Sequence, residues 1–169
     1  CYRAEMVEEY ISRIRQNLNL DISIYIEENL GGTGGSLLKA FDQLDDEFIL
    51  IMGDLFFSIN LEKIFKYGKK LNSKVLLVCK YTDHPFDSDL IGIGENQILK
   101  NFYLRESDRT QKMNGLVPPL GNSGIFYFQK EFIIDNCTKN CDIHSVIFEF
   151  IKKNRSNSHI GLISKIGIH

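Results

Sequence analysis

A glycine-rich segment, residues 29–35 (Asn-Leu-Gly-Gly-Thr-Gly-Gly), is the first part of the chain whose residue types suit ligand binding. It follows alternating residues at 22–26, which predict a strand, and precedes an apolar helical stripe at 37–44. Glycines at such a turn let backbone N–H groups approach a ligand, and a helix N-terminus favours anionic groups. The spacing is neither that of a P-loop nor that of a dinucleotide-binding fingerprint. A tight turn without a ligand is the alternative interpretation.

Asp54 is the second candidate, because it follows a run at 48–52 that is apolar on both faces, as in a central parallel strand. In an open α/β sheet, ligands bind beyond the carboxyl ends of the strands. A carboxylate there suits Mg²⁺, which keeps several waters and shares its site with substrate phosphates. A helix N-cap or a loop hydrogen bond is the alternative. The glycine-rich turn lies one βα unit earlier, and this favours the metal site.

Two further polar clusters follow along the chain. Asp87-Ser88-Asp89 spells the acidic motif with which many glycosyltransferases hold a metal-bound sugar nucleotide. It follows a His-Pro turn and precedes an apolar run instead of ending one, which favours a solvated loop or a brace of the pocket. Residues 122–124 (Asn-Ser-Gly) precede an apolar run and could offer an amide and exposed backbone to a hydroxyl-rich ligand, or form a turn.

The cysteines and histidines predict no further centre. Cys137, Cys141 and His144 supply at most three metal ligands without a second Cys/His pair, so we interpret them as surface residues near a helix start. Cys79 lies in an apolar run and is expected to be a small buried hydrophobe. The spacing of the remaining histidines supports no nucleophile set of the Ser/His/Asp or Cys/His kind.

The elements that must position these residues alternate between helix and strand in the first eighty residues. The expected helices are 6–18, 37–44 and 61–71, and the expected strands are 22–26, 48–52 and 75–79. This alternation predicts an α/β fold, with a mostly parallel sheet and helices on both faces. The second half is more β-rich. It predicts a hairpin of 90–93 with 97–102, a strand at 124–128, a helix at 145–153 and a strand at 160–164.

The composition suits a single soluble globular domain over residues 1–169. Apolar residues make up 43% of the chain and charged residues 25%, and the formal net charge is −2. These values exclude a disordered chain, a collagen-like repeat and a nucleic-acid binder held mainly by net charge. No apolar run approaches the ~20 residues that span a bilayer, and no secretion signal opens the chain. We therefore expect neither a nucleic acid nor a membrane as partner.

Three segments together resemble motifs of the sugar-1-phosphate nucleotidyltransferases. Residues 29–37 resemble the Leu-Gly-Thr-Ala/Gly-Gly-Ala/Ser-Leu segment, 48–56 the strand that ends in Asn-Gly-Asp, and 122–128 the Asn-Ala/Thr-Gly-Ile/Val-Tyr strand. Their order and separation agree with the family over essentially the whole chain. Residues 84–91 (His-Pro-Phe-Asp-Ser-Asp-Leu-Ile) are similar to a subset that acts on heptose or mannose 1-phosphates. Some members of that subset are fused to a phosphatase of the haloacid dehalogenase type.

The resemblance implies a Rossmann-like fold of the nucleotide-diphospho-sugar transferase type. It also implies a reaction, in which a nucleoside triphosphate and a sugar 1-phosphate give a nucleotide sugar and pyrophosphate. The sugar phosphate attacks the α-phosphorus in line, and Mg²⁺ neutralises charge on the phosphates. Carried over by position, the implied roles are Mg²⁺ binding for Asp54, nucleotide binding for Gly32, Thr33, Gly34 and Gly53, and sugar binding for Asn122 and Gly124. Glu27 or Glu28 matches an acidic position of the family, with a structural role.

The chain also departs from the family pattern. Family members begin with a strand and a glycine-rich loop whose Arg and Lys grip the triphosphate, and they carry a second metal aspartate in an Asp-Ile-Gly-Thr segment. We therefore expect Cys1 and His169 to be internal positions of a longer protein, and residues 1–169 alone to be catalytically weak or inactive. Residues 103–105 (Tyr-Leu-Arg) stand where the family often has Glu-Lys-Pro, Gly31 replaces a leucine and Met52 replaces an asparagine.

Three functions follow from these residues. The leading hypothesis is a cytoplasmic nucleotidyltransferase that makes nucleotide-activated heptose, such as GDP-heptose, or mannose for surface polysaccharides. A homo-oligomer and a fused phosphatase domain are left open. The second hypothesis is a non-catalytic nucleotide-sugar-binding or regulatory module of the same fold. The third is a metal-dependent glycosyltransferase that uses Asp87 and Asp89.

Overall fold

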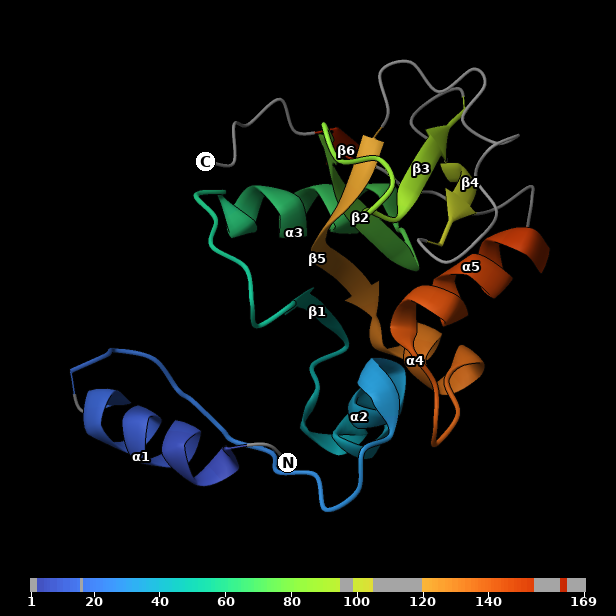
Figure 1. Cartoon of the computed structure of the whole chain (residues 1–169). Coiled ribbons are helices and arrows are strands. Elements are labelled where there is room, and N and C mark those ends of the chain that lie inside the picture. The colour runs from blue at the N-terminus through green and yellow to red at the C-terminus, as the bar shows by residue number, and fades with distance from the viewer. Residues whose placement is uncertain (1–2, 16, 95–98, 105–119, 154–161, 164–169) are drawn as a thin grey trace.

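The apolar runs of the sequence form one mixed sheet in a computed structural model, which describes residues 3–15, 17–94, 99–104, 120–153 and 162–163 (Figure 1). The helices are α1 (Ala4–Arg15), α2 (Gly32–Lys39), α3 (Leu61–Leu71), α4 (Lys130–Asn136) and α5 (Ile143–Lys153), with a 3₁₀ turn at Phe41–Gln43. The strands are β1 (Glu47–Ile51), β2 (Val75–Tyr81), β3 (Leu90–Ile93), β4 (Leu99–Tyr103), β5 (Leu120–Gln129) and β6 (Leu162–Ile163). No helix in these described ranges combines the length and the apolar character that crossing a bilayer requires.

The ten-residue strand β5 is the centre of the sheet. The strand order is β4-β3-β5-β2-β6, and β1 pairs with β5 as well. β2 follows one edge of β5 along its length, so β3 and β1 share the other edge, at residues 120–121 and 125–129 of β5 respectively. The predicted hairpin is confirmed, since β3 and β4 pair antiparallel, although residues 95–98 between them lie outside the described structure.

The α/β class and the β-rich second half are confirmed, but the expectation of a mostly parallel sheet is not. β5 runs antiparallel to β1, β2 and β3, and among the described strands only β2 and β6 form a parallel pair. β1 and β2 do run in the same direction, as the α3 crossover requires. However, β5 lies between them. The sequence did not predict this, because burial of a strand on both faces does not show which strand lies next to it.

The predicted strand at 22–26 is wrong for the described structure. Residues 21–27 have no regular secondary structure, and no described strand lies alongside them to accept their backbone hydrogen bonds. Ile24 and Ile26 are each 40% exposed. Alternation alone therefore does not form a strand, because a strand also needs a neighbour for its N–H and C=O groups.

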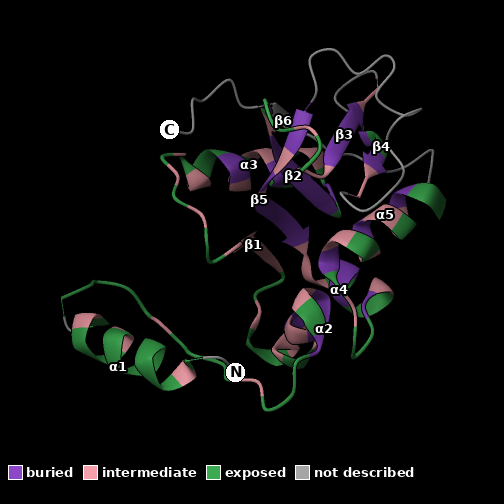
Figure 2. Cartoon of the chain, in the orientation of Figure 1, coloured by how far each residue is buried: buried purple, intermediate pink, exposed green. Residues whose placement is uncertain are grey.

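Two apolar cores lie on the two faces of the sheet (Figure 2). Alternate residues of β2 and β5 point to opposite faces, as the pleat of a strand dictates. Phe126 and Phe128 join the core covered by α2, α4 and α5, whereas Ile125 and Tyr127 join the core covered by α3. Helices on both faces are therefore confirmed, although α4 was not predicted.

Helix α3 shows why its prediction from local sequence succeeds. Asn60 caps its N-terminus by accepting a hydrogen bond from the Lys63 N–H at 2.9 Å, and Asn72 ends it in the left-handed conformation. Gly68 faces the sheet, where a Cβ atom would lie 2.6 Å from the Tyr127 ring. α1 also forms where it was predicted, but none of its residues is buried.

Glu47 on β1 links this sheet to helix α3 through its carboxylate. The carboxylate forms an ion pair with Lys69 Nζ at 2.8 Å and accepts a hydrogen bond from the Tyr127 hydroxyl. These two contacts, chiefly that of Lys69, lower the pKa of Glu47 below its ordinary value of 4.5. A carboxyl whose pKa is lowered by folding stabilises the fold above its unfolded pKa, and this contribution is lost as the pH falls through the folded pKa.

We therefore expect Glu47→Gln to reduce the free energy of unfolding at neutral pH by about 1 kcal/mol, allowing for solvent screening. As the pH falls below 4.5 the difference between the variant and the wild type should shrink, because protonation of Glu47 in the folded state removes the wild type's advantage. Urea unfolding at several pH values measures this. Glu62→Gln is the control, since Glu62 pairs with Lys66 on the exposed surface of α3. An equal loss in the control, or a difference that does not shrink as the pH is lowered below 4.5, would contradict the prediction.

Candidate functional site

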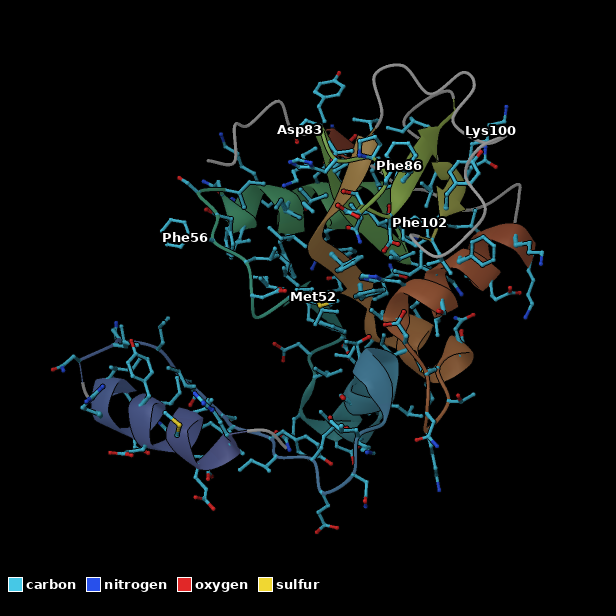
Figure 3. The ribbon with its side chains drawn as sticks, viewed as in Figure 1. Met52, Phe56, Asp83, Phe86, Lys100 and Phe102 are labelled. Carbon is cyan, nitrogen blue, oxygen red and sulfur yellow. The ribbon has the colours of Figure 1, made fainter. Side chains whose placement is uncertain are left out.

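A cavity of about 540 Å³ lies beyond the carboxyl ends of β1 and β2, where ligands were expected. Six segments line it: the residues after β1, the end of β2, the turn before β3, Leu104 after β4, the first half of β5 and the start of α5. Figure 3 shows Met52 below this region, at the end of β1, and Phe86 above it, in the turn before β3. Sequence positions from 52 to 145 therefore meet at one place.

Asp54 lies on the wall that follows β1. Met52 N–H donates to the Gly124 carbonyl at 3.0 Å, and this bond anchors the segment to β5. The Asp54 carboxylate is exposed and makes no hydrogen bond or ion pair with another described residue. Its oxygens are therefore available to a cation, and a single carboxylate suits Mg²⁺, whose other ligands are usually waters and substrate phosphates.

Residues 122–124 form an irregular step in β5 at the cavity wall. The register between β2 and β5 shifts here, and Gly124 adopts φ +77°. The Asn122 side-chain oxygen accepts a hydrogen bond from Gly124 N–H at 3.1 Å, and the Ser123 hydroxyl donates to the Val78 carbonyl at 2.6 Å. A Cβ atom on Gly124 would lie 2.9 Å from Leu55. Asn122 and Gly124 both line the cavity, and within the described ranges the Asn122 amide NH₂ has no acceptor.

The turn over residues 82–89 forms the opposite wall, and its own hydrogen bonds hold it. The Thr82 hydroxyl contacts the Ser88 hydroxyl at 3.2 Å and accepts from His84 N–H at 3.1 Å. Asp87 N–H and the Ser88 hydroxyl both donate to the His84 carbonyl, at 3.1 Å each. Asp87, Ser88 and Asp89 line the cavity. The acidic motif is therefore part of the pocket wall.

Charged side chains of both signs line this cavity. Asp54, Asp87, Asp89 and Asp142 are acidic, and Lys80 is basic. Lys80 directly follows the five buried residues of β2, and it makes no hydrogen bond or ion pair with another described residue. His144 pairs with Asp89. Such a set suits a ligand that combines hydroxyl groups with a phosphate and a bound cation.

The glycine-rich turn lies outside this cavity, against residues 137–142. Gly34 and Gly35 N–H donate to the Cys141 carbonyl at 2.9 and 3.1 Å, and Cys141 N–H donates to the Gly31 carbonyl at 2.9 Å. Gly32 begins α2 with φ +71°, and a Cβ atom on it would lie 2.5 Å from the Cys141 carbonyl oxygen. Close backbone packing therefore accounts for the glycines. The nucleotide contacts of Gly32, Thr33 and Gly34 stay a prediction, as does that of Gly53, which precedes Asp54.

Thr33 connects this turn to the cavity through Asp142. Its hydroxyl donates to the Asp142 carboxylate at 2.9 Å and accepts from Ile143 N–H at 2.9 Å. The same carboxylate accepts from Ser145 N–H at 3.0 Å, as an N-cap does. The start of α5, which carries His144, is thus held by a residue 110 positions earlier.

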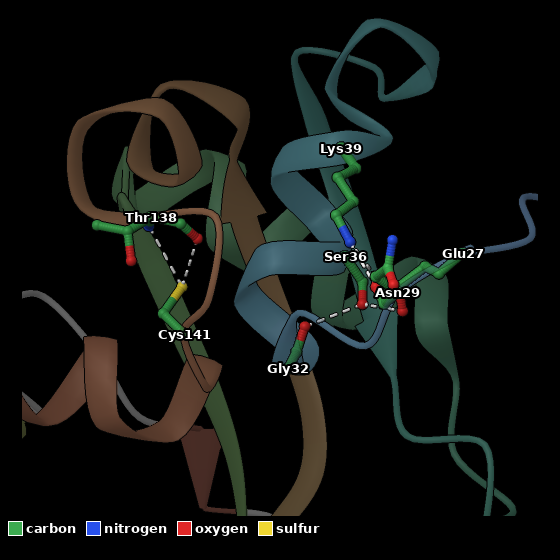
Figure 4. Close-up of polar contacts among 7 residues, drawn as sticks. All are labelled: Glu27, Asn29, Gly32, Ser36, Lys39, Thr138 and Cys141. Atoms are coloured by element: carbon green, nitrogen blue, oxygen red, sulfur yellow. Dashed lines mark hydrogen bonds and ion pairs between the residues drawn. The ribbon is translucent and has the colours of Figure 1, made fainter. Parts of the chain in front are cut away.

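Glu27 has the structural place that the resemblance implied (Figure 4). Its carboxylate accepts from the Ser36 hydroxyl at 2.6 Å and from Lys39 Nζ at 3.1 Å. These contacts, led by the Ser36 hydrogen bond, lower the pKa of Glu27 below its ordinary value. Lys39 also donates to the Asn29 carbonyl at 2.7 Å, so the segment before the glycine-rich turn is fastened to α2.

The cysteines are placed partly as expected. Cys79 is fully buried, as predicted, and burial raises the pKa of its thiol to about 12. Cys137 was expected on the surface, but it is buried because α4 ends against α2, and burial raises the pKa of its thiol to about 12. Cys141 lies 3.3 Å from Thr138 N–H, next to the glycine-rich turn (Figure 4).

Three titratable residues of the cavity wall, Lys80, Asp142 and His144, were not predicted to lie there from the sequence. Lys80 carried a local signal, since it is a charged residue at the end of an otherwise apolar strand. Asp142 carried none, and His144 was expected on the surface but is only 25% exposed and lines the cavity. The place of both residues depends on the docking of α5 beside β4.

The chain is similar in sequence to known proteins over most of its length. No protein-family model matches the chain. It is 28% identical over 155 residues to the bifunctional protein GlmU of Methanocaldococcus jannaschii, covering 91% of this chain and 30% of that protein. It is 27% identical over 135 residues to the D-glycero-alpha-D-manno-heptose 1-phosphate guanylyltransferase of Campylobacter jejuni subsp. jejuni serotype O:2, covering 79% of this chain and 54% of that protein. The chain thus spans about a third of the length of the first relative and about half of the length of the second.

The fold is shared with solved structures of known proteins. The crystal structure of HddC from Yersinia pseudotuberculosis superposes with a TM-score of 0.73 at 17% identity, covering 97% of this chain and 67% of that one. A structure of HddC complexed with GMP-PN superposes with a TM-score of 0.71. The resemblance to nucleotidyltransferases and the Rossmann-like fold class are confirmed.

Proposed function

We propose that the protein containing this chain is a sugar-1-phosphate nucleotidyltransferase, and that the cavity holds the sugar phosphate and the metal side of its active site. One observation carries this proposal. Asp54 and the pair Asn122 and Gly124 come from two separate motifs, and they line a single cavity at the ends of the strands. The reaction joins a nucleoside triphosphate to a sugar 1-phosphate and releases pyrophosphate.

The chemistry required of this chain is binding and orientation. Asp54 would hold Mg²⁺, which when bound supplies charge neutralisation for the phosphates. Lys80 would contact the phosphate of the sugar 1-phosphate, because its ammonium lines the cavity without another described partner. Asn122 would donate its amide N–H groups to a sugar hydroxyl. Holding the two substrates in line accounts for the rate increase without a covalent intermediate.

For the substrates we propose GTP and a manno-configured sugar, either heptose or mannose 1-phosphate. The relative from Campylobacter jejuni is named for guanylyl transfer to a heptose 1-phosphate, and a neighbouring fold was solved with GMP-PN. The product would be a nucleotide-activated sugar for surface polysaccharides, made in the cytoplasm.

The test uses the complete protein with Mg²⁺, each of the four common nucleoside triphosphates, and mannose or D-glycero-D-manno-heptose 1-phosphate. We expect release of pyrophosphate together with a GDP-sugar that chromatography resolves. Tight binding of the GDP-sugar without any turnover would instead support the non-catalytic module. Transfer of sugar from the GDP-sugar to an acceptor, without pyrophosphate release, would support the glycosyltransferase.

A further inference from the structure

We infer that Asp89, held in place by His144, recognises a hydroxyl group of the sugar and so determines which sugar phosphates the site accepts. The inference rests on the proposed function and adds a specificity residue from the turn over residues 82–89. Asp89 is the acceptor that would touch the ligand. His144 is a positioning residue, because it acts through Asp89.

The first observation is the contact between these two side chains. His144 Nδ1 lies 2.8 Å from Asp89 Oδ2, and both residues line the cavity. The side chains are 25% and 13% exposed, so the pair is largely shielded from water while one side faces the ligand space. The His144 ring also packs against Phe102 and Phe126, with ring centroids 6.4 and 5.6 Å apart. His144 is therefore held by its ring contacts, and it in turn holds the carboxylate of Asp89 in position.

The second observation is that Asp89 is joined to Asn122. Asn122 N–H donates to the Asp89 carbonyl at 2.9 Å, which sets the two residues side by side on the cavity wall. Asn122 presents amide N–H donors, whereas Asp89 presents a carboxylate acceptor. A sugar ring carries neighbouring hydroxyl groups, each of which can donate and accept, so this donor and acceptor together fit such a ring.

The third observation is that hydrogen bonds within the turn over residues 82–89 hold the backbone that carries Asp89. Thr82, His84 and Ser88 are linked to one another by hydrogen bonds within the turn itself. A preorganised acceptor loses little freedom when the ligand binds. A hydrogen bond to a charged group is also stronger than one between neutral groups, so the carboxylate should discriminate strongly between a hydroxyl and its absence.

The experiment measures kcat and KM of the complete protein for mannose 1-phosphate and for its 2-, 3-, 4- and 6-deoxy analogues. We expect the wild type to disfavour at least one analogue by about tenfold to a hundredfold in kcat/KM. Asp89→Asn should remove most of that preference at one ring position, chiefly by raising KM for mannose 1-phosphate. Asp83→Asn is the matched control, because Asp83 lies in the same turn, is 91% exposed and does not line the cavity.

Two variants of His144 separate positioning from a general structural role. His144→Leu keeps an apolar contact with Phe102 and Phe126 but removes the donor to Asp89, so its sugar preference should resemble that of Asp89→Asn. His144→Asn restores a donor near the position of Nδ1 and should recover part of the preference. Circular dichroism and urea unfolding show whether each variant is folded.

The outcomes also separate this inference from the proposed function. Turnover with an unchanged preference in folded Asp89→Asn would overturn the inference and leave the nucleotidyltransferase standing. Binding of mannose 1-phosphate that depends on Asp89, measured by calorimetry without turnover, would support the inference and overturn the reaction. If the wild type neither binds nor converts any of these sugar phosphates, both are overturned.

Discussion

Replacing Asp54 by Asn should lower the kcat of the complete protein by about a hundredfold to a thousandfold, since a metal ion contributes several kcal/mol to stabilising charge on the reacting phosphates. Asp54 is the described carboxylate at the end of β1, and it faces the cavity without another described partner. An amide keeps the size of the side chain but loses its charge, so the affinity for Mg²⁺ should fall. Raising the Mg²⁺ concentration should recover part of the rate.

The measurement is pyrophosphate release at several Mg²⁺ concentrations. Asp45→Asn is a suitable control, because Asp45 precedes the same strand, is exposed and is not part of the cavity wall. Its kcat should equal that of the wild type. If Asp54→Asn turned over at the wild-type rate while Asp87→Asn lost Mg²⁺ dependence, the metal would belong to the turn before β3 and our assignment of Asp54 would be wrong.

Gly32→Ala should destabilise the fold by about 2–4 kcal/mol, for two reasons that add together. Gly32 has φ +71°, a conformation that costs an alanine energy. The added methyl group would also lie 2.5 Å from the Cys141 carbonyl oxygen, so the backbone of residues 139–142 must move. Because Asp142 caps α5, the same change should also weaken binding of the sugar phosphate at the cavity.

Urea unfolding of the chain measures the first effect. Gly53→Ala is the matched control for stability, since no atom lies within 4 Å of a Cβ atom placed there and its φ is not positive. Its free energy of unfolding should stay within about 0.5 kcal/mol of the wild type. An equally stable Gly32→Ala would show that residues 139–142 adjust without cost, contrary to the packing described above.

The elements that could be predicted are those whose signal is local. β1 and β2 are short apolar runs between turns. α3 has an amphipathic stripe, with Asn60 as its N-cap and Asn72 as its C-cap. The neighbours of each strand could not be predicted in the same way. The insertion of β5 between β1 and β2 depends on contacts over 45 to 80 residues, for which a single sequence shows no pattern.

In the candidate site too, the residues that could be predicted are those with a local sequence signal. Asp54 and Asn122 could be found because each adjoins a strong strand signal, and both line the cavity. The glycine-rich turn was interpreted as a ligand loop, yet its glycines are required by the chain at 139–142, which no local pattern reveals. His144 is brought to Asp89 only by the docking of α5, so only the folded chain could reveal that pair.

The central position of β5 also bears on the order in which the chain can fold during synthesis. Among the described strands, β1 pairs with β5 alone and β3 pairs with β4 and β5, and β2 is joined to both only through β5. Of the described strands, β3 and β4 can thus pair first, but the ladders of β1, β2 and β3 with β5 must wait until β5 has emerged from the ribosome. Until then β1 and β2 lack β5, the neighbour that they share among the described strands, and binding by a chaperone would matter most at that stage.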